Sequence, residues 1–387
     1  MNKTATHQPL RMVEPSFNSS LVDLIIELDY LRKKKLQGST HPVVFFQLKK
    51  LFHTLESIGS ARIEGNNTTI AEYIETKIDS TAQITEPIKE IQNMEHALEF
   101  IDTKAKDEII NRNLICDLHK ITVNTLTPPP DGEGDETPGL YRLKQVRINN
   151  ASVIPPAPQD IQWYMDELFD FVQTDGKPKY DLLKIAIAHH RFLWIHPFTN
   201  GNGRTGRLFT YLLLIKMGFN VNIGRILNPT AVFCSNRKEY YKYLALADTG
   251  TDEGILSWCE YALDGLKNEI EKIDKLLNYE YLSKEILKPA LKMSLQRGVI
   301  AEHEEKILQR TVEKQVLKAS DLTDILKGKT PSEISRQIGK LKDMKMLTAE
   351  KDGTRKYVLR FDNNFLLRSI IEVLGQKGFL PAQHNEK

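Results

Sequence analysis

The stretch DLLKIAIAHHRFLWIHPFTNGNGRTGRLFTYLLLIKMG, residues 181–218, joins two apolar segments through a short polar loop. Residues 181–195 are apolar on nearly every side, which predicts a helix buried inside its domain. The segment that begins at Arg204 is equally apolar and is expected to close at Gly218. The polar loop therefore links two central helices, and we expect the functional site to lie where they meet.

Helical periodicity recurs over most of the chain, whereas strand signals are scarce. The Pro- and Gly-rich residues 127–139 predict a loop, and residues 141–160 contain strand-like pieces around Asn149-Asn150 that predict a small hairpin. The fold class is therefore predicted as all-α with one small β-hairpin. Further helices are expected at 20–37, 43–65, 86–106, 111–126, 160–175, 236–248 and 255–277.

The character of the sequence changes from about residue 284. Residues 318–361 predict a helix, a second helix that starts near Pro331, and a hairpin with its turn at Asp352-Gly353, which is the order of a winged helix-turn-helix. Residues 327–360 hold ten Lys or Arg and four Asp or Glu, a local charge of +6. That excess of positive charge fits a nucleic-acid-binding domain, and it equally fits a solvated helix face in a domain for protein contacts.

The loop HPFTNGNGRTGR, residues 196–207, contains the parts of an anion-binding site. Backbone N–H groups at the start of a helix are unpaired and attract negative charge, and Gly201 and Gly203 let the backbone approach a phosphate closely. Arg204 and Arg207 lie three residues apart, so their guanidinium groups share a helix face. His196 can take a proton from a hydroxyl near neutral pH.

Each of these parts has an ordinary structural explanation, since a glycine-rich turn is usually only a turn and arginines at a helix start are usually surface charges. Their conjunction within twelve residues favours nucleophilic attack on a bound nucleotide phosphate. His189 and His190 are interpreted as structural, because no third ligand at metal spacing accompanies them.

Composition sets limits on the class of protein. The 387 residues are 41% hydrophobic and 27% charged with a net charge of +2, as is ordinary for a globular protein. The chain shows no apolar run long enough to cross a membrane, and its first residues lack the core of a signal peptide. Three widely spaced cysteines fit a reducing compartment, so a cytoplasmic location and no membrane partner are expected.

The loop resembles the signature of the Fic family, His-Pro-Phe-x-[Asp/Glu]-Gly-Asn-Gly-Arg-x-x-Arg, over residues 196–207. The resemblance extends from about residue 10 to 275, and the C-terminal winged helix also resembles that of many bacterial members. Members transfer AMP from ATP to a Ser, Thr or Tyr hydroxyl of a target protein. By position, the resemblance makes His196 the general base and Phe198 the anchor of the loop. It assigns nucleotide binding to Asn200, Gly201, Asn202, Gly203, Arg204 and Arg207.

Other segments extend the resemblance. SARIEG, residues 60–65, resembles the family's inhibitory motif, which makes Ser60 and Glu64 inhibitory and pairs Glu64 with Arg207. A carboxylate and a terminal phosphate would compete for the same guanidinium group. The segment around Ala151, Ser152 and Val153 resembles the flap that contacts nucleotide or target. The residues matched more weakly to the nucleotide site are Tyr240, Tyr241 and Asp248.

Asn200 is the one departure from the signature, because the family places a metal-binding acid at this position. The resemblance implies ATP and Mg²⁺ as cofactors, and Asn200 would offer the metal only a neutral oxygen, so weaker metal binding is expected. The departure leaves three alternatives open: a slow enzyme, an enzyme that uses another phosphate-containing donor (a donor of UMP or phosphocholine), or a nucleotide-binding regulator.

The leading prediction is an autoinhibited protein adenylyltransferase, a nucleotidyltransferase that takes AMP from ATP to a target hydroxyl. The alternative is a nucleotide-sensing DNA-binding regulator with weak or no transferase activity. The expected organisation is an N-terminal helical region with the inhibitory motif at 1–110, a Fic core at 111–275 and a winged-helix domain at 284–387. ATP and a target protein are the expected partners; DNA and a second copy in a homodimer are open alternatives.

Overall fold

The computed structural model describes residues 9–34, 39–79, 81–148, 153–174, 176–219, 226–362 and 364–380. The chain divides into two compact units. The first comprises Met1–Lys35, Glu56–Thr68 and Ile84–Ile270, and the second comprises Leu36–Leu55, Thr69–Gln83 and Glu271–Lys387. The division falls within two long helices, α2 (Pro42–Glu64) and α11 (Asp252–Leu277).

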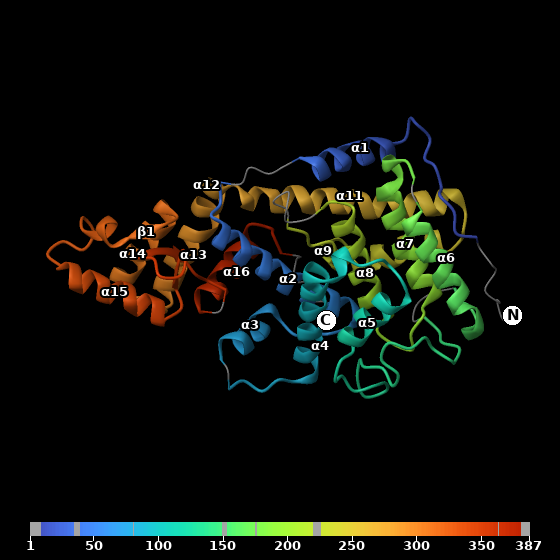
Figure 1. Ribbon diagram of the computed structural model, residues 1–387, viewed down its shortest axis with the longest axis horizontal. Helices are drawn as coiled ribbons and strands as arrows, with labels where there is room; N and C mark the ends of the chain where they lie inside the picture. The colour runs from blue at the N-terminus through green and yellow to red at the C-terminus, as the bar shows by residue number, and fades with distance from the viewer. Residues whose placement is uncertain are drawn as a thin grey trace. The chain divides into compact units, whose positions relative to one another are not determined.

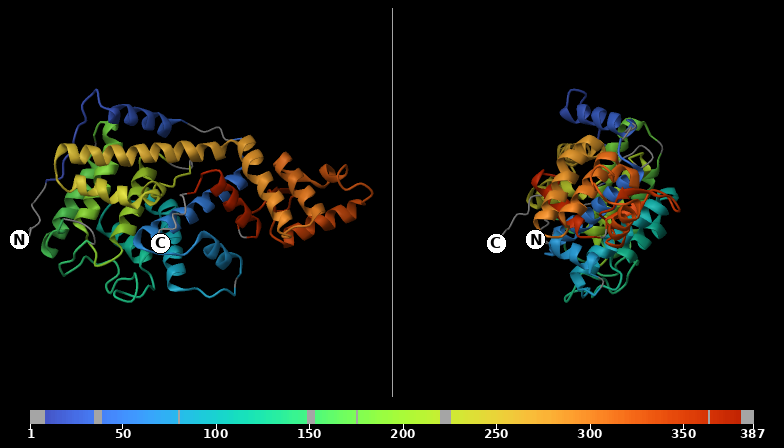
Figure 2. Two further views of the ribbon diagram at one scale, coloured as in Figure 1. Left: turned by 180° about the vertical axis from the view of Figure 1, so that it is seen from behind. Right: turned by 90° about the vertical axis from the view of Figure 1, so that its left-hand side faces the viewer.

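The first unit is built from helices, and its described residues contain no strand (Figures 1 and 2). Besides the end of α2 and most of α11, its elements are α1 (Ser20–Lys33), α4 (Glu86–Thr103), η1 (Ala105–Asp107), α5 (Arg112–Thr122), η2 (Pro158–Asp160), α6 (Ile161–Gln173), η3 (Pro178–Tyr180), α7 (Asp181–Ile195), α8 (Asn202–Lys216), α9 (Thr230–Ser235) and α10 (Arg237–Ala247). The predicted all-α fold is confirmed. Among the described helices, none is both long enough and apolar enough to cross a membrane.

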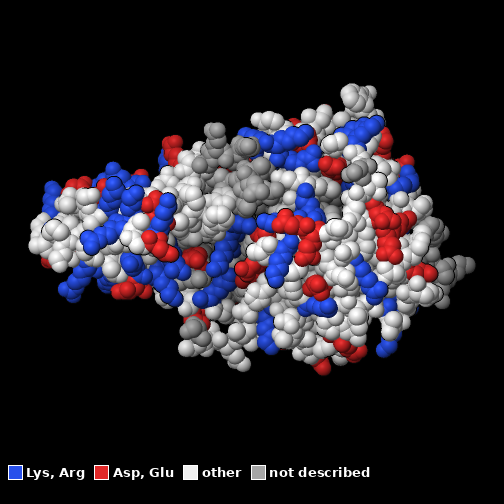
Figure 3. Space-filling model, viewed as in Figure 1, with Lys and Arg blue, Asp and Glu red and all other residues white. Residues whose placement is uncertain are grey.

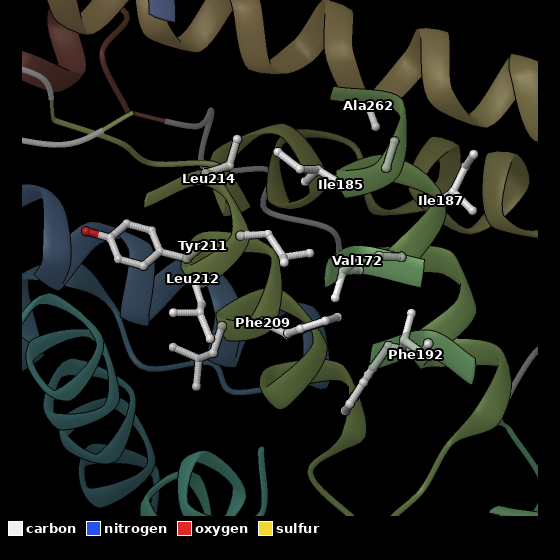
Figure 4. Close-up of a cluster of buried hydrophobic side chains, with 14 of the residues drawn as sticks. Val172, Ile185, Ile187, Phe192, Phe209, Tyr211, Leu212, Leu214 and Ala262 are labelled. Atoms are coloured by element: carbon white, nitrogen blue, oxygen red, sulfur yellow. The ribbon is translucent and has the colours of Figure 1, made fainter. Parts of the chain in front are cut away.

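Helices α7 and α8 form the centre of the first unit, as their apolar sequences predict (Figure 4). Phe192 of α7 packs against Phe209 of α8 with the ring centroids 5.7 Å apart. From α11, the Trp258 indole donates a hydrogen bond to the carbonyl oxygen of Ala186 at 2.7 Å. Both helices are thus enclosed on several sides, which fixes the position of the loop that joins them.

The end of α8 shows how the sequence sets the length of these helices. Gly218 has φ +102°, a left-handed conformation that costs glycine little. Its N–H donates to Ile215, and the N–H of Phe219 donates to the carbonyl oxygen of Leu214 at 3.1 Å. These bonds satisfy carbonyl groups that the helix end would leave unpaired. The predicted stop at Gly218 is confirmed.

The second unit combines helices with a small sheet. Besides the start of α2 and the end of α11, it contains α3 (Ile70–Ile78), α12 (Tyr279–Tyr281), the π-helical turn η5 (Leu282–Leu287), α13 (Lys288–Gln296), α14 (Glu302–Lys314), β1 (Leu317–Lys318), η6 (Ala319–Leu322), α15 (Pro331–Asp343), β2 (Leu347–Ala349), β3 (Lys356–Leu359) and α16 (Leu366–Gln376). The strands are antiparallel in the order β1-β3-β2. Leu317 pairs with Tyr357, and Leu347 pairs with Leu359.

One expected helix of this unit differs from the structure. The first helix expected within 318–329 is only the four-residue 3₁₀ turn η6. The Asp321 carboxylate accepts from the N–H of Lys318 at 2.7 Å, and the Thr323 hydroxyl donates to the carbonyl of Ser320 at 3.0 Å. Such local side-chain bonds compete with helix formation. The order of the remaining elements matches the predicted winged helix-turn-helix, whose assignment stays a prediction.

The hairpin predicted around Asn149-Asn150 has its turn outside the described residues, and residues 141–148 and 153–157 on either side of it form no strand. The predicted domain ranges stay a prediction; by their contacts, residues 36–55 and 69–83 group with residues 271–387. Within the second unit, Gln47 of α2 explains part of this grouping. Its amide donates to the carbonyl of Leu359 at 3.0 Å and accepts from the N–H of Phe361 at 2.7 Å.

We predict that Leu212→Ala lowers the free energy of unfolding by about 2–5 kcal/mol, because the buried side chain leaves a cavity between packed helices. Leu212 has no exposed surface, whereas Leu143 in the same unit is 91% exposed. Leu143→Ala is therefore the matched control, with a change of less than about 0.5 kcal/mol. Urea unfolding followed by circular dichroism measures both variants. Equal losses in the two would contradict the central place of α8.

Candidate active site

The loop at residues 196–201 is closed by a side chain from the start of α8. The Asn202 amide donates to the carbonyl oxygen of Phe198 at 2.9 Å and accepts from the Phe198 N–H at the same distance. The Phe198 ring is fully buried and anchors the loop in the core. The predicted anchor role of Phe198 thus fits its place, whereas the Asn202 side chain shapes the loop.

His119 on α5 supports the same loop, although its only signal in the sequence is a histidine on an apolar helix face. Its ring stacks on Phe198 with centroids 3.8 Å apart and an interplanar angle of 3°. The Gly139 N–H donates to Nδ1 at 2.9 Å, so Nε2 carries the proton and donates to the carbonyl of Asn200 at 3.0 Å. Burial lowers the pKa of His119 to about 4, which keeps the ring neutral.

His196 follows α7 directly and adopts a left-handed conformation with φ +52°. Its Nδ1 lies 3.2 Å from the carbonyl oxygen of Leu193, which can only accept. Nδ1 therefore carries the proton, and Nε2 keeps a free lone pair. Burial lowers the pKa of His196 to about 4, and Arg142 acts in the same direction. The ring is neutral at pH 7 and can accept a proton.

Arg142 is a second functional residue that sequence reasoning missed. Its Nε donates to the carbonyl of His196 at 2.8 Å, and its Nη2 donates to that of Pro156 at 2.7 Å. Its backbone N–H also bonds the carbonyl of Pro197 at 2.9 Å. The segment that follows Tyr141 is thereby fastened to the loop at 196–201.

One of the three predicted flap residues lies within the described part of the chain. Ala151 and Ser152 lie outside the described residues, and Val153 is half-buried. The two arms of the segment are held together by side chains, because the Gln145 amide donates to the carbonyl of Pro155 at 2.9 Å. The structure thus brings residues 142–146 and 155–156 to the loop that carries His196.

The first turn of α8 is shaped to approach an anion. Gly201 has φ +72°, and a Cβ atom there would lie 2.9 Å from Val123. At Gly203, a Cβ atom would lie only 2.1 Å from Oε1 of Glu64. The Glu64 carboxylate therefore rests directly on the helix N-terminus, where backbone N–H groups and the helix dipole favour negative charge.

Arg207 completes the contact with α2. Its Nε donates to the Ser60 hydroxyl at 2.8 Å, and its Nη2 donates to the Ser60 carbonyl at 3.0 Å and to Oε1 of Glu64 at 2.7 Å. Burial would raise the pKa of Glu64, but the charges of Arg207 and Arg204 outweigh it, so the pKa lies below its ordinary value. The structure thus makes the predicted pairing of Glu64 with Arg207.

Glu56 lies on the same face of α2, one turn before Ser60. Its carboxyl group accepts from the N–H of Thr230 at 2.9 Å and bonds the hydroxyl of the same residue, at the start of α9. Burial raises the pKa of Glu56 to about 8. Glu56, Ser60 and Glu64 are spaced four residues apart, so they lie along one helix face. That face fixes where the Glu64 carboxylate sits.

Arg204 is fully buried and is also paired with carboxylates. Its Nη1 donates to Oε1 of Glu90 at 2.8 Å, and its Nη2 donates to the backbone carbonyl of Glu133 at 2.6 Å. The Glu133 carboxylate lies 3.5 Å from the same Nη2. Nε of Arg204 is buried and has no hydrogen-bond partner among the described residues.

Asn200 is fastened to the loop that contains Glu133. Its amide donates to the carbonyl of Gly134 at 3.1 Å and approaches Oε2 of Glu133 at 3.4 Å, and its backbone N–H donates to Asp135 at 3.0 Å. A cation here would meet a neutral oxygen and a carboxylate, which are ligands that Mg²⁺ accepts. Among the described residues, no three His, Cys, Asp or Glu side chains gather in one place. The ion would therefore need phosphate oxygens as further ligands.

The residues predicted more weakly have partners of their own, and the two tyrosines also lie close enough to Arg207 to interact with its charge. The Tyr240 hydroxyl lies 2.8 Å from Nε2 of His189, whose Nδ1 lies 2.6 Å from the Thr210 hydroxyl. The ring of Tyr241 lies beside that of Tyr240, with centroids 5.4 Å apart. Asp248 accepts from Nε2 of His190 at 2.8 Å. The structural interpretation of both histidines agrees with these bonds.

The assembled site offers three chemical functions together. His196 presents a neutral ring nitrogen, the first turn of α8 presents backbone donors, and Arg204 and Arg207 present buried positive charge. This combination suits deprotonation of a hydroxyl beside a bound polyphosphate. In the structure, the positive charges are engaged by the protein's own carboxylates.

Comparison with known proteins finds a family model that matches the part of the chain carrying this site. The model of the Fic/DOC family matches residues 109–214, from just before α5 to near the end of α8. The chain is 28% identical over 197 residues to "Protein adenylyltransferase Fic" of Nematostella vectensis and 29% identical over 203 residues to that of Drosophila melanogaster. The two alignments cover 49% and 51% of this chain but only 42% and 37% of the relatives. The chain thus matches less than half the length of these relatives.

Two solved structures share the fold. A Fic family protein from Desulfovibrio desulfuricans G20 aligns over 91% of this chain and 98% of its own, with a TM-score of 0.54 and 20% identity. A Fic domain containing signaling protein from Bacteroides thetaiotaomicron VPI-5482 aligns over 67% of this chain and 98% of its own, with a TM-score of 0.51 and 17% identity. At these identities the likeness extends to the fold alone.

We predict that His196 stays neutral in the free protein at every pH from 8 down to about 5.5, because burial lowers its pKa to about 4. Histidine ring signals in NMR spectra measure this directly, with His196→Gln to assign the resonance. The control is the urea-unfolded chain, whose histidines should titrate near their ordinary value of about 6.5. A midpoint near that value in the folded protein would refute the neutral ring.

Proposed function

We propose that the chain, which matches the Fic/DOC family model over residues 109–214, is an autoinhibited protein adenylyltransferase of that family. The proposed reaction transfers AMP from ATP to a Ser, Thr or Tyr hydroxyl of a target protein. The observation that carries the proposal is the neutral Nε2 of His196 beside a helix N-terminus with two buried arginines. The names of the curated relatives support the same activity.

The reaction follows from the roles of these groups. Nε2 of His196 accepts the proton of the target hydroxyl, and the hydroxyl oxygen forms a bond to the α-phosphorus of ATP. The bond from that phosphorus to the oxygen it shares with the β-phosphate breaks, and pyrophosphate leaves. The backbone N–H groups from Gly201 to Arg204 and the two guanidinium groups hold the phosphates. Mg²⁺ beside Asn200 would neutralise phosphate charge when bound.

Glu64 is the proposed inhibitor of this reaction. Its carboxylate occupies the helix N-terminus at Gly203 and forms an ion pair with Arg207 at 2.7 Å. A terminal phosphate needs the same donors, so ATP and Glu64 exclude each other from the guanidinium group. Ser60 accepts two further hydrogen bonds from Arg207, which keeps the guanidinium group aligned with Glu64. Release of α2 would therefore activate transfer.

We predict that Glu64→Gly raises the rate of AMP transfer at least tenfold, since a gain of about 1.4 kcal/mol in phosphate binding suffices for that factor. Label from α-³²P-ATP incorporated into the protein itself or into a lysate measures the rate. Glu64→Gln tests the charge alone, and Glu99→Gln on the exposed face of α4 is the control that should change nothing. Unchanged transfer in a folded Glu64→Gly protein would contradict the inhibition.

The base has its own prediction. His196→Ala, placed in the Glu64→Gly protein, should reduce transfer to background while the dissociation constant of ATP changes less than about threefold. The reason is that the histidine moves a proton and makes none of the phosphate contacts. Calorimetry gives the binding and incorporated label gives the rate. Transfer at the parent rate would remove His196 from the mechanism.

A second candidate function rests on the surface of the second unit. Helix α15 buries Ile334, Ile338 and Leu341, which leaves Ser335 and Arg336 exposed. Basic side chains gather on the part of the surface that carries α15 (Figure 3). We propose that this surface binds duplex DNA, with α15 against a groove and the basic hairpin that follows it against phosphates.

The ion pairs of this surface identify which cations are engaged. Lys340 is paired with Glu304 at 2.7 Å, and Lys356 lies 3.7 Å from Glu350. Arg336 and Arg355 are exposed, and no ion pair is recorded for either within the described residues. They are therefore the best candidates for phosphate contacts.

We predict that the protein binds a labelled 30-base-pair duplex at 50 mM salt and that binding weakens steeply by 200 mM salt. Arg336→Ala and Arg355→Ala should each reduce the slope of affinity against salt by about 1, because each removes one phosphate contact. The control is Arg297→Ala, because the side chain of Arg297, at the end of α13, is already paired with Glu372. Fluorescence anisotropy is the measurement. Failure to bind any duplex at 50 mM salt would refute a DNA surface.

A further inference from the structure

The contacts of Asn200 explain why this position holds an amide. Its Nδ2 donates to the carbonyl of Gly134 at 3.1 Å and lies 3.4 Å from Oε2 of Glu133. An aspartate at this position would have no hydrogen to donate and would face a carbonyl oxygen and a second carboxylate. Two such carboxylates repel each other unless a cation lies between them. Without a metal, the site therefore accommodates either Glu133 or an acid at position 200, but not both.

Asp135 in the same loop does not provide the missing acid. Its Oδ1 accepts from the Thr137 N–H at 2.8 Å and from the Thr137 hydroxyl at 3.2 Å, and its Oδ2 accepts from the N–H of Asn200 at 3.0 Å. It is also buried. Asp135 thus positions the loop, and both of its carboxylate oxygens already accept hydrogen bonds within it.

Glu133 differs in each of these respects. Its side chain is 48% exposed, so its carboxylate can turn without unpacking the loop. The backbone of the same residue is fixed, because its carbonyl accepts from Nη2 of Arg204 at 2.6 Å. Its carboxylate lies 3.5 Å from that guanidinium group, which is one of the two proposed to hold phosphates. A carboxylate thus stands at the edge of the proposed phosphate site, next to Asn200.

We propose that Glu133 is the carboxylate ligand of the Mg²⁺ ion that accompanies ATP. The negative charge that the family signature places at position 200 is supplied here from the neighbouring loop. Mg²⁺ is held in proteins by one or two carboxylates together with substrate phosphates, so one carboxylate is sufficient. Asn200 adds its amide oxygen as a neutral ligand after rotation about its last bond. This inference rests on the proposed function, because it requires ATP in the site.

The same carboxylate has a competing explanation as a second inhibitor. At 3.5 Å from Arg204, it would then block a phosphate as Glu64 does at Arg207. The two roles predict opposite effects of Glu133 on ATP binding when Mg²⁺ is present. A ligand strengthens ATP binding when Mg²⁺ is added, whereas an inhibitor weakens ATP binding whether or not Mg²⁺ is present.

The test measures ATP binding by calorimetry at 0 and 5 mM Mg²⁺ in a Glu64→Gly, His196→Ala parent, which frees Arg207 and prevents turnover. In the parent, Mg²⁺ should tighten ATP binding at least tenfold. Glu133→Gln should lose most of that gain, and binding without Mg²⁺ should stay equal or become tighter. Glu133→Gln with Asn200→Asp returns one carboxylate to the site and should restore the gain. Glu136→Gln, an exposed acid of the same loop, is the control and should match the parent.

Three results would overturn the proposal. An undiminished Mg²⁺ effect in Glu133→Gln removes Glu133 from the metal site. Tighter ATP binding in Glu133→Gln by the same factor at both Mg²⁺ concentrations makes Glu133 an inhibitor instead. Absence of ATP binding in the parent and in every variant refutes the proposed function itself, and the inference with it. The experiment measures how Mg²⁺ changes the affinity for ATP. A wrong assignment of Glu133 is therefore distinguishable from a wrong assignment of the transferase activity.

Discussion

The buried guanidinium of Arg207 is the constraint on which the rest of the site depends. A cation without exposure to water must be paired and hydrogen-bonded, and α2 supplies both needs through Ser60 and Glu64. Removal of one partner from a buried ion pair leaves an uncompensated charge. The end of α2 can therefore leave Arg207 only if another anion takes its place. In the proposed function that anion is a nucleotide phosphate, so substrate binding and release of inhibition are one exchange.

Around this pair, the loop at 196–201 is held in place by bonds that do not involve substrate. Asn202 closes it, His119 stacks beneath it and bonds the carbonyl of Asn200, and Arg142 bonds the carbonyl of His196. A catalytic group acts best when its geometry is set before the substrate arrives. The backbone donors of α8 and the lone pair of His196 are prearranged in this way, whereas the positive charges are masked. The proposed inhibition would therefore act on charge rather than on shape.

The sequence predicted the parts that are local and periodic. Buried helices on either side of residues 196–201 follow from unbroken apolar stretches, and the pairing of Glu64 with Arg207 follows from a motif match. The supports from distant segments could not be predicted in this way. His119 and Arg142 meet the loop only through the fold, and a single histidine or arginine carries no periodic signal. The short turn η6 was mistaken for a helix because side-chain bonds to the backbone, which propensity does not count, hold it as a turn.

The central claim is that Glu64 and the terminal phosphates of ATP compete for Arg207. Calorimetric dissociation constants of AMP, ADP and ATP, in the wild-type protein and in Glu64→Gln, test it most directly. The account predicts that the wild-type protein binds the three nucleotides with similar affinity, because Glu64 withholds the contacts that additional phosphates would make. In Glu64→Gln, affinity should rise from AMP to ATP by at least about tenfold. The same ratio of ATP to AMP affinity in both proteins would contradict the competition.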